Sequence, residues 1–223
     1  MPMLVDRHLP DYDVSEVYTV TVTASIEDTW RAIRTTDIAR DPFVRVLVNA
    51  RLVPQRALAV LRRQHRPDRW APVRFGDLVE SGEEWIKLGE EREVELVAGL
   101  VGRFWQRDFG LRRMTPEEFA AFDEPGYAKT VVDLSLRPYG STRTLLLYET
   151  RTATTDDDAR AKFARYWRFV GPFAGFVMRR ALFAIRAEAE RTARGTPERT
   201  AHDTRGAVDV DLTLDEVERR PTP

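Results

Sequence analysis

The residues with the clearest chemical potential are a carboxylate and a guanidinium two positions apart, Glu149 and Arg151, in the segment LYETRTA. Alternate residues of a β-strand point to the same face, so this pair would lie beside Leu147. If that face lines a cavity, the pair can orient the polar head of a ligand. An ion pair at a sheet margin is the alternative, and a register with Leu146 and Tyr148 inward would turn both charges towards solvent.

A second set of residues has the chemistry of acids and bases. Asp133 lies in the strand-like segment KTVVDLSL, and Asp108 follows the end of an earlier strand. A cyclase would use a buried carboxyl group of raised pKa together with a tyrosine such as Tyr127 or Tyr148. No spacing pairs these groups, and solvated carboxylates at strand edges are the alternative. The catalytic residues are therefore left unassigned.

The composition excludes several other kinds of chemistry. The 223 residues contain no cysteine, which rules out disulfides, thiolate metal sites and a cysteine nucleophile. The three histidines, His8, His65 and His202, show no metal-binding spacing, and the sequence contains no G-x-S-x-G, P-loop or G-x-G-x-x-G pattern. We therefore expect no metal, no nucleotide cofactor and no hydrolase triad.

The charge balance gives no indication of a nucleic-acid partner. Thirty-five Lys and Arg residues stand against 36 Asp and Glu residues, for a net charge of −1. The basic cluster from Arg56 to Arg69 suits an acidic head group, a membrane surface or RNA, with a solvated Arg-rich helix as the alternative. The N-terminus lacks an apolar signal segment and no stretch is apolar for the roughly 18 residues of a membrane span. These features predict a cytoplasmic protein.

The elements that position these residues begin with a strand. Glu16–Thr23 alternates Tyr and Val with Thr, which is the period of a half-buried strand. Ser25 and Asp28 then form the start of a capped helix, and a further helix is predicted for Arg51–Gln64. The pattern next predicts strands at Phe75–Glu80, Glu84–Leu88 and Glu91–Trp105, with turns at Gly82 and Gly89.

The second half of the chain predicts two more strands and one long helix. A short helix is expected over Thr115–Phe122, before strands at Ala128–Leu136 and Thr142–Ala153. An acidic run then suits the start of a helix that continues to about Arg194, with a kink at Gly171–Pro172. Beyond it, residues 195–223 hold no Phe, Trp or Tyr, and we expect a disordered tail.

Several segments resemble a known superfamily. VYTVTVTASIEDTWRAI looks like the first strand and capped helix of the START/Bet v 1-like helix-grip proteins, also called SRPBCC or polyketide cyclase-like proteins. GLVGRFWQRDFG, FDEPGYAKT and LYETRTATTDDDARAKFARYWRFVGPF are similar to an uncharacterised bacterial branch of that superfamily. The resemblance spans residues 14–192. It implies an α+β helix-grip fold, in which a curved antiparallel sheet wraps around a long C-terminal helix and encloses a cavity.

The order of elements and this resemblance together predict three parts: an N-terminal extension over residues 1–13, a helix-grip domain over 14–194 and the tail over 195–223. One face of the last helix is rich in aromatic residues, which either fill the core or line an apolar cavity; the resemblance favours the cavity. The predicted ligand-binding residues are Trp85, Phe104, Leu134, Leu147, Glu149, Arg151, Phe163, Trp167, Val170 and Ala174.

The expected function is the binding of a hydrophobic small molecule, a lipid or a polyketide-like compound, between the sheet and the last helix. Two alternatives stay open at this stage. One is a cyclase- or dehydratase-like enzyme that uses carboxylate and tyrosine groups in the same cavity. The other is a ligand-free interaction or membrane-associated module, which a filled core together with a contiguous apolar patch on the outer face of Phe169–Phe183 would favour. The sequence specifies neither the ligand nor the oligomeric state.

Overall fold

A computed structural model describes residues 3–40, 74–82 and 85–195 of the chain. The helix predicted for Arg51–Gln64 and the tail expected beyond Gly195 lie outside these described residues. The described elements, in chain order, are α1 (Leu4–His8), β1 (Val14–Val22), α2 (Ile26–Thr35), the 3-10 turn η1 (Ile38–Arg40), α4 (Phe75–Ser81), β2 (Ile86–Glu91), β3 (Glu95–Gly102), α5 (Pro116–Ala121), β4 (Ala128–Tyr139), β5 (Arg143–Thr154) and α6 (Asp157–Gly195).

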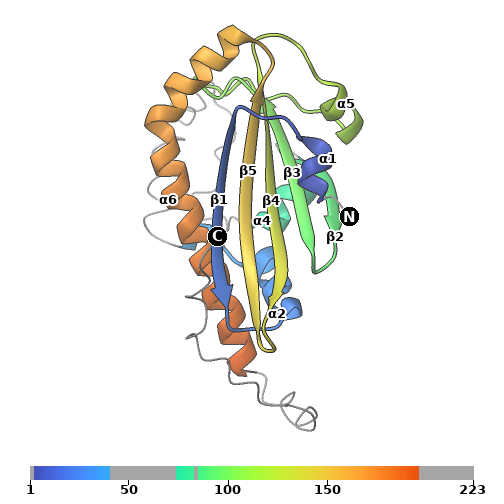
Figure 1. Ribbon diagram of the computed structural model, residues 1–223, viewed down its shortest axis with the longest axis vertical. Coiled ribbons are helices and arrows are strands. Elements are labelled where there is room, and N and C mark those ends of the chain that lie inside the picture. The colour runs from blue at the N-terminus through green and yellow to red at the C-terminus, as the bar shows by residue number, and fades with distance from the viewer. Residues whose placement is uncertain (1–2, 41–73, 83–84, 196–223) are drawn as a thin grey trace, which may run out of the picture.

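The five strands form one antiparallel sheet in the order β1-β5-β4-β3-β2 (Figure 1). β4 and β5 make a long hairpin. β1, which is distant from β5 in the sequence, pairs with it, with Val14 opposite Thr152. Strand side chains alternate between the two faces. The predicted α+β class, with a curved antiparallel sheet and a long C-terminal helix, is confirmed and is consistent with a helix-grip arrangement.

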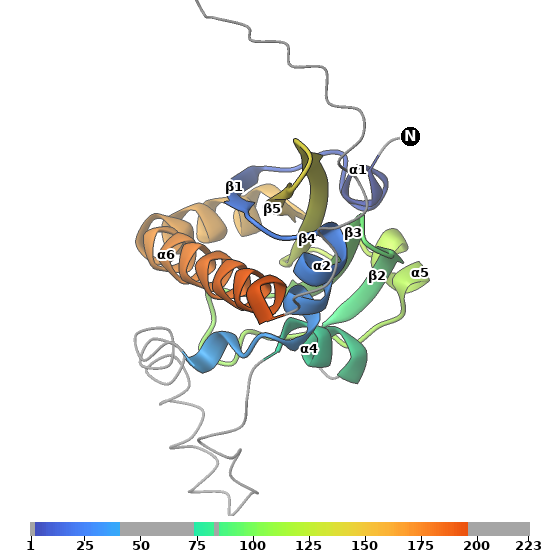
Figure 2. The same ribbon diagram turned by 90° about the horizontal axis from the view of Figure 1, so that it is seen from below.

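Helices cover both faces of the sheet. Figure 2 shows α2, α4 and α6 on the concave side, which we call the inner face, and α1 and α5 on the convex side, which we call the outer face. Each face has its own hydrophobic cluster. The inner cluster joins the sheet to Trp30, Ile33 and Leu182, and the outer cluster joins it to Val5 and Phe119.

Two features of the helices follow local rules that the sequence predicts: the N-terminal cap of α2 and the proline inside α6. The Ser25 hydroxyl accepts a hydrogen bond from the backbone amide of Asp28 (3.0 Å) and caps α2 as expected. α6 runs from Asp157 to Gly195 and contains Pro172, which cannot donate to the helix ladder. The ribbon of α6 changes direction along its length, so that the helix follows the sheet (Figures 1 and 2).

Two local predictions are wrong. The segment from Phe75 is the helix α4 and not a strand, because Phe75 and Val79, one helical turn apart, both pack into the inner cluster. Gly82 ends this helix with φ 60°, a left-handed conformation that suits glycine. Gly89 lies inside β2, and the chain instead turns after Glu91, where Glu93 adopts φ 63°.

The first described residues pack onto the sheet. Val5 and Leu9 of the predicted N-terminal extension are buried at 0% and 5% exposure against the outer cluster. Among the described helices, none has the length and apolarity that crossing a membrane requires.

Candidate functional site

The inner face of the sheet is divided into a closed half and a more open half. In the closed half, Leu136 and Leu146 are fully buried beneath α2 and the C-terminal half of α6. In the other half, Leu100, Thr130 and Thr150 keep partial exposure, although their strand positions place them on the same inner face. The N-terminal half of α6 therefore leaves the inner face incompletely filled within the described residues.

Aromatic side chains close one end of this region. Phe163, near the start of α6, is 2% exposed and stacks on Trp167 with ring centroids 5.5 Å apart. Phe104, in the loop after β3, meets Phe163 edge-on at 6.5 Å. Trp167, Val170 and Ala174 are half-buried and face the same side of α6 as Phe163, since they follow its helical spacing. Four predicted site residues on α6 therefore share one face.

Two further predicted residues belong to the closed half of the inner face. Leu134 is 3% exposed inside the inner cluster. Trp85 is half-buried, packs against that cluster and lies 6.2 Å from Phe75, measured between ring centroids. Both residues lie on the α6 side of the sheet and pack in or against the inner cluster.

The remaining predicted residues face the other way. In β5, Leu146 and Tyr148 point inward, so Leu147, Glu149 and Arg151 point to the outer face. Of the alternatives left open by the sequence, β5 adopts the register with Leu146 and Tyr148 inward, and Glu149 and Arg151 form an ion pair on the outer face (2.6 Å). The two charges are not in solvent either, since the N-terminal segment covers them.

Arg151 connects β5 to this N-terminal segment. Its guanidinium donates to Glu149 (2.6 Å), to Asp6 (2.9 Å) and to the backbone carbonyl of Leu9 (3.3 Å). The Arg151 side chain is only 11% exposed. A buried guanidinium with three partners of this kind holds two chain segments together, and its position beneath α1 keeps it away from any ligand on the inner face.

A second buried polar group lies beside it on the outer face. Glu95 is 2% exposed and accepts hydrogen bonds from the backbone amides of Leu4 (2.9 Å) and Val5 (3.0 Å) at the start of α1. Asp133, on the neighbouring strand β4, is 1% exposed, and within the described part of the chain neither of its carboxyl oxygens has a hydrogen-bond partner. Burial raises the pKa of Asp133 to about 8, and the nearby Glu95 carboxylate adds to the shift.

This arrangement separates the groups that a cyclase would need to bring together. Asp133 and Tyr127 belong to the outer face, whereas Tyr148 is buried on the inner face. Burial also raises the pKa of Tyr148 above its usual range. Asp108 is exposed in the loop after β3. The acid–base candidates therefore do not converge on one site.

Sequence reasoning missed a polar cluster at the edge of the inner face. The Tyr18 hydroxyl donates to Glu16 (2.7 Å), and the Tyr18 ring lies 6.3 Å from that of Tyr148 in a stacked arrangement. The Arg179 guanidinium from α6 lies 5.1 Å from the centre of the Tyr18 ring. The two-residue spacing of Glu16 and Tyr18 was the available signal, because it puts both on one face of β1.

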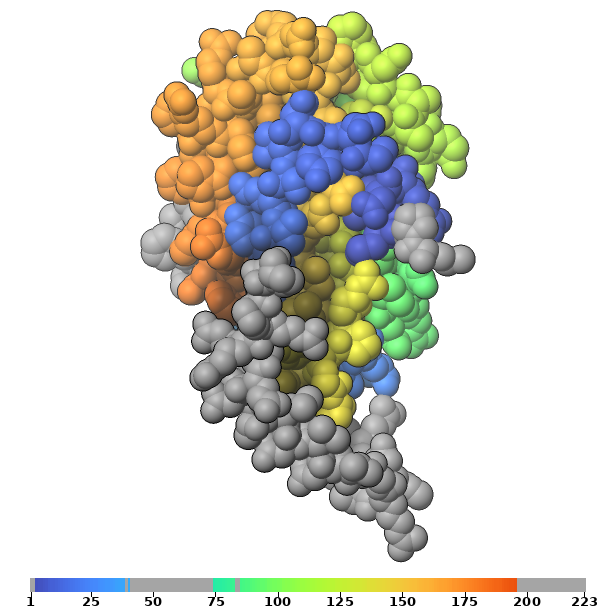
Figure 3. Space-filling model, in the orientation of Figure 1, coloured from blue at the N-terminus to red at the C-terminus, as the bar shows by residue number. Residues whose placement is uncertain are grey.

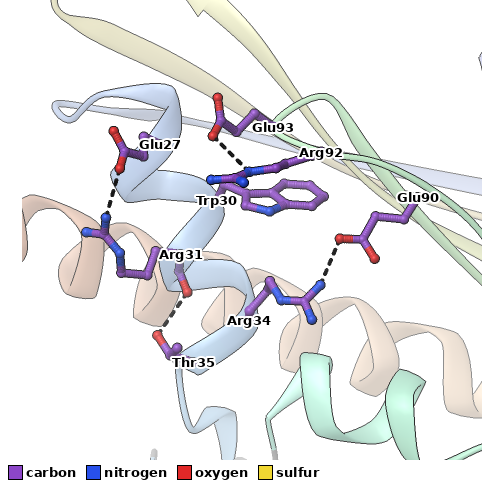
Figure 4. A pocket seen from close by; sticks show the side chains of 8 residues that line it. All are labelled: Glu27, Trp30, Arg31, Arg34, Thr35, Glu90, Arg92 and Glu93. Atoms are coloured by element: carbon purple, nitrogen blue, oxygen red, sulfur yellow. Dashed lines mark hydrogen bonds and ion pairs between the residues drawn. The ribbon is translucent and has the colours of Figure 1, made fainter.

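A separate open hollow of about 420 Å³ lies between α2 and the β2–β3 turn (Figure 4). Trp30 forms its floor, and charged side chains surround it. Arg34 pairs with Glu90 (2.8 Å), and Arg31 pairs with Glu27 (3.1 Å). Because carboxylates already compensate these guanidinium groups, the hollow offers no excess charge to a ligand, and its ion pairs are best explained as links between α2 and the sheet.

Comparisons with known proteins add little to this geometry. No family model matches the sequence, and a search of curated proteins found no match to it. Among solved structures, the chain is similar to the crystal structure of the hypothetical protein jhp0584 from Helicobacter pylori, at 12% identity, over 82% of this chain and 93% of that chain, with a TM-score of 0.36. Among the described residues, no group of three or more His, Cys, Asp or Glu side chains is arranged to hold a metal ion.

Proposed function

We propose that the protein binds a hydrophobic small molecule in the open half of the inner face, which we call the inner groove: the surface of Leu100, Thr130 and Thr150 together with Trp167, Val170 and Ala174 of α6. The observation that carries this proposal is their partial exposure on a face that α6 otherwise covers. A mostly apolar lining with a few hydroxyl groups is typical of small-molecule sites.

The composition of the inner groove suits an apolar ligand with a weakly polar part. Trp167, Val170 and Leu100 offer apolar area, whose removal from water contributes about 25 cal/mol per Å². The hydroxyl groups of Thr130 and Thr152 lie 2.9 Å apart on the same face and bond each other. These hydroxyl groups are neutral, so a lipid or polyketide-like compound fits this groove better than an ionic compound does. Such a ligand is in keeping with a helix-grip protein that acts as a carrier.

A titration with N-phenyl-1-naphthylamine, a neutral fluorescent apolar probe, tests the proposal. We expect saturable binding of one probe per chain. The variant Ala174→Trp should abolish it by filling the inner groove, whereas Ala161→Trp, at an exposed position of the same helix, should not.

Native mass spectrometry of the purified protein, followed by solvent extraction, would then reveal any compound carried over from the cell. Probe binding that is equal in both variants, or absent in the unmodified chain, would overturn the proposal. Circular dichroism of the two variants separates a filled groove from an unfolded chain.

A further inference from the structure

The outward face of α6 exposes large aromatic side chains. Phe169 is 72% exposed, Phe173 60% and Phe183 55%, and Phe176 is 39% exposed. In chain order, from Phe169 to Phe183, these residues are spaced by four, three and seven positions, so they form one row along the helix. The row lies opposite the side that carries Phe163 and Ile185. We call this row the Phe face. It extends for about 20 Å at the helical rise of 1.5 Å per residue.

The Phe face lies at the surface of the molecule. Figure 3 shows α6 along one side of the molecule, next to β1. Four of the seven exposed large hydrophobic residues among the described part of the chain lie on this helix. Scattered apolar residues are normal on protein surfaces, but Phe169, Phe173 and Phe176 lie within two helical turns of one another and form an apolar patch, with Phe183 two turns further on and Arg180 between. Such patches mark interaction sites.

The charges beside the Phe face have one sign. The sequence from Ala159 to Ala187 contains six arginines, one lysine and no acidic residue, although the whole chain carries a net charge of −1. Arg165 and Arg168 flank the row, and within the described residues no carboxylate pairs with either of them. The helix therefore presents aromatic rings next to uncompensated guanidinium groups.

From this juxtaposition we propose that the Phe face docks onto the surface of an anionic lipid bilayer. Helices that lie in a membrane interface combine an apolar row with basic residues, because the rings enter the acyl boundary while the arginines meet lipid phosphates. A second copy of the chain would bring the same arginines against each other, which disfavours a dimer through this face. The surface does not depend on the inner groove, since it lies on the opposite side of α6.

Co-sedimentation of the full chain with lipid vesicles tests this docking. We expect binding to vesicles that contain phosphatidylserine, little binding to pure phosphatidylcholine, and loss of binding at high salt. The double variant Phe169→Ser/Phe173→Ser should lower the vesicle affinity by about ten-fold or more, because it removes apolar insertion. Arg165→Glu/Arg168→Glu should remove the preference for the anionic lipid.

Val17→Ser is the matched control, because Val17 is 53% exposed on the outer face of β1, away from α6, and this variant should bind vesicles normally. Equal binding to both vesicle types, or binding that survives the Phe variants, would overturn the proposal. So would a dimer in analytical ultracentrifugation that the Phe variants dissociate, since the face would then serve self-association.

The two proposals fail independently in these experiments. The Phe169→Ser/Phe173→Ser variant should still bind N-phenyl-1-naphthylamine in the inner groove, and Ala174→Trp should still bind anionic vesicles. Thermal unfolding monitored by circular dichroism tests whether each variant remains folded.

Discussion

The hydroxyl group of Tyr18 occupies the space that a Cβ atom on Gly175 would need. The α6 helix therefore approaches β1 this closely because position 175 has no side chain. The Tyr18 ring is held in place from other sides, since its hydroxyl bonds Glu16 at 2.7 Å and its ring stacks on Tyr148. This contact fixes the distance between α6 and the edge strand, and with it the width of the inner groove.

Gly175→Ala should destabilise the protein. The added methyl group displaces Tyr18, which costs about 1–3 kcal/mol, while the better helix propensity of alanine returns about 1 kcal/mol. We expect a net loss of about 1 kcal/mol in the free energy of unfolding, measured by urea denaturation. Gly195→Ala, where a Cβ meets open space, is the control and should be neutral or stabilising. Combining Gly175→Ala with Tyr18→Phe should restore stability, and a double variant no better than Gly175→Ala would contradict the assignment.

Asp133→Asn should flatten the pH dependence of stability. The folded-state pKa of Asp133, about 8, lies above its ordinary value of 3.8, so the native state holds a proton that the unfolded chain releases. Its stabilising contribution is complete below about pH 4 and is lost as the pH rises towards 8. The free energy of unfolding of Asp133→Asn should therefore rise relative to that of the unmodified protein as the pH increases. The change in this difference between pH 4 and pH 8 should be about 2–5 kcal/mol.

Urea denaturation across this pH range measures the effect. Asp108→Asn, which changes an exposed carboxylate, should leave the curve unchanged. Parallel curves for Asp133→Asn and the unmodified protein would show that Asp133 is ionised in the folded state.

Arg151→Met should release the N-terminal segment. The substitution removes the bonds to Asp6 and to the Leu9 carbonyl and leaves the Glu149 carboxylate without its partner. Breaking a buried pair in this way costs about 3 kcal/mol. Hydrogen exchange should show faster exchange at residues 4–9 than in the unmodified chain. Adding Glu149→Gln should recover part of the stability, and unchanged exchange at these residues would exclude Arg151 as the connection.

Ser25→Ala should lower stability by about 1 kcal/mol, because the amide of Asp28 loses its cap. Thr115→Ala, which removes the corresponding cap of α5 at Glu118, should have an effect of similar size. Thermal unfolding of both variants provides the comparison. A neutral Ser25→Ala would indicate that packing of Trp30 and Ile33 alone defines the start of α2.

The local rules predicted the frame of the fold well. Alternating residues identified β1, and the acidic start and continuous helical spacing identified α6, because these patterns depend on neighbours in the sequence. The prediction of a strand at Phe75–Glu80 was wrong, since a helix of two turns contains too few residues for its pattern to distinguish the period of a helix from that of a strand. Packing of Phe75 and Val79 against the inner cluster decides its structure, and that is a tertiary contact.

The candidate site was less predictable than the fold. Residues on α6 were placed correctly relative to one another, because one helix fixes their spacing. The face that Glu149 and Arg151 occupy depends on the parity of β5, and a shift of one residue exchanges the two faces. The N-terminal segment that covers them is distant in sequence, so no local pattern indicated that charged residues in β5 would be buried under α1.

The pairing of β1 with β5 has a consequence for how the chain folds. Among the described strands, β1 is the first in chain order and its partner β5 is the last, with Val14 opposite Thr152. The β4–β5 hairpin can form from local contacts, whereas β1 must wait until almost the whole domain has left the ribosome. Long-range pairings of this kind slow folding and leave strand edges open in the meantime. An early fragment that ends before β5 would therefore expose an unpaired strand, and chaperone binding during synthesis should concentrate there.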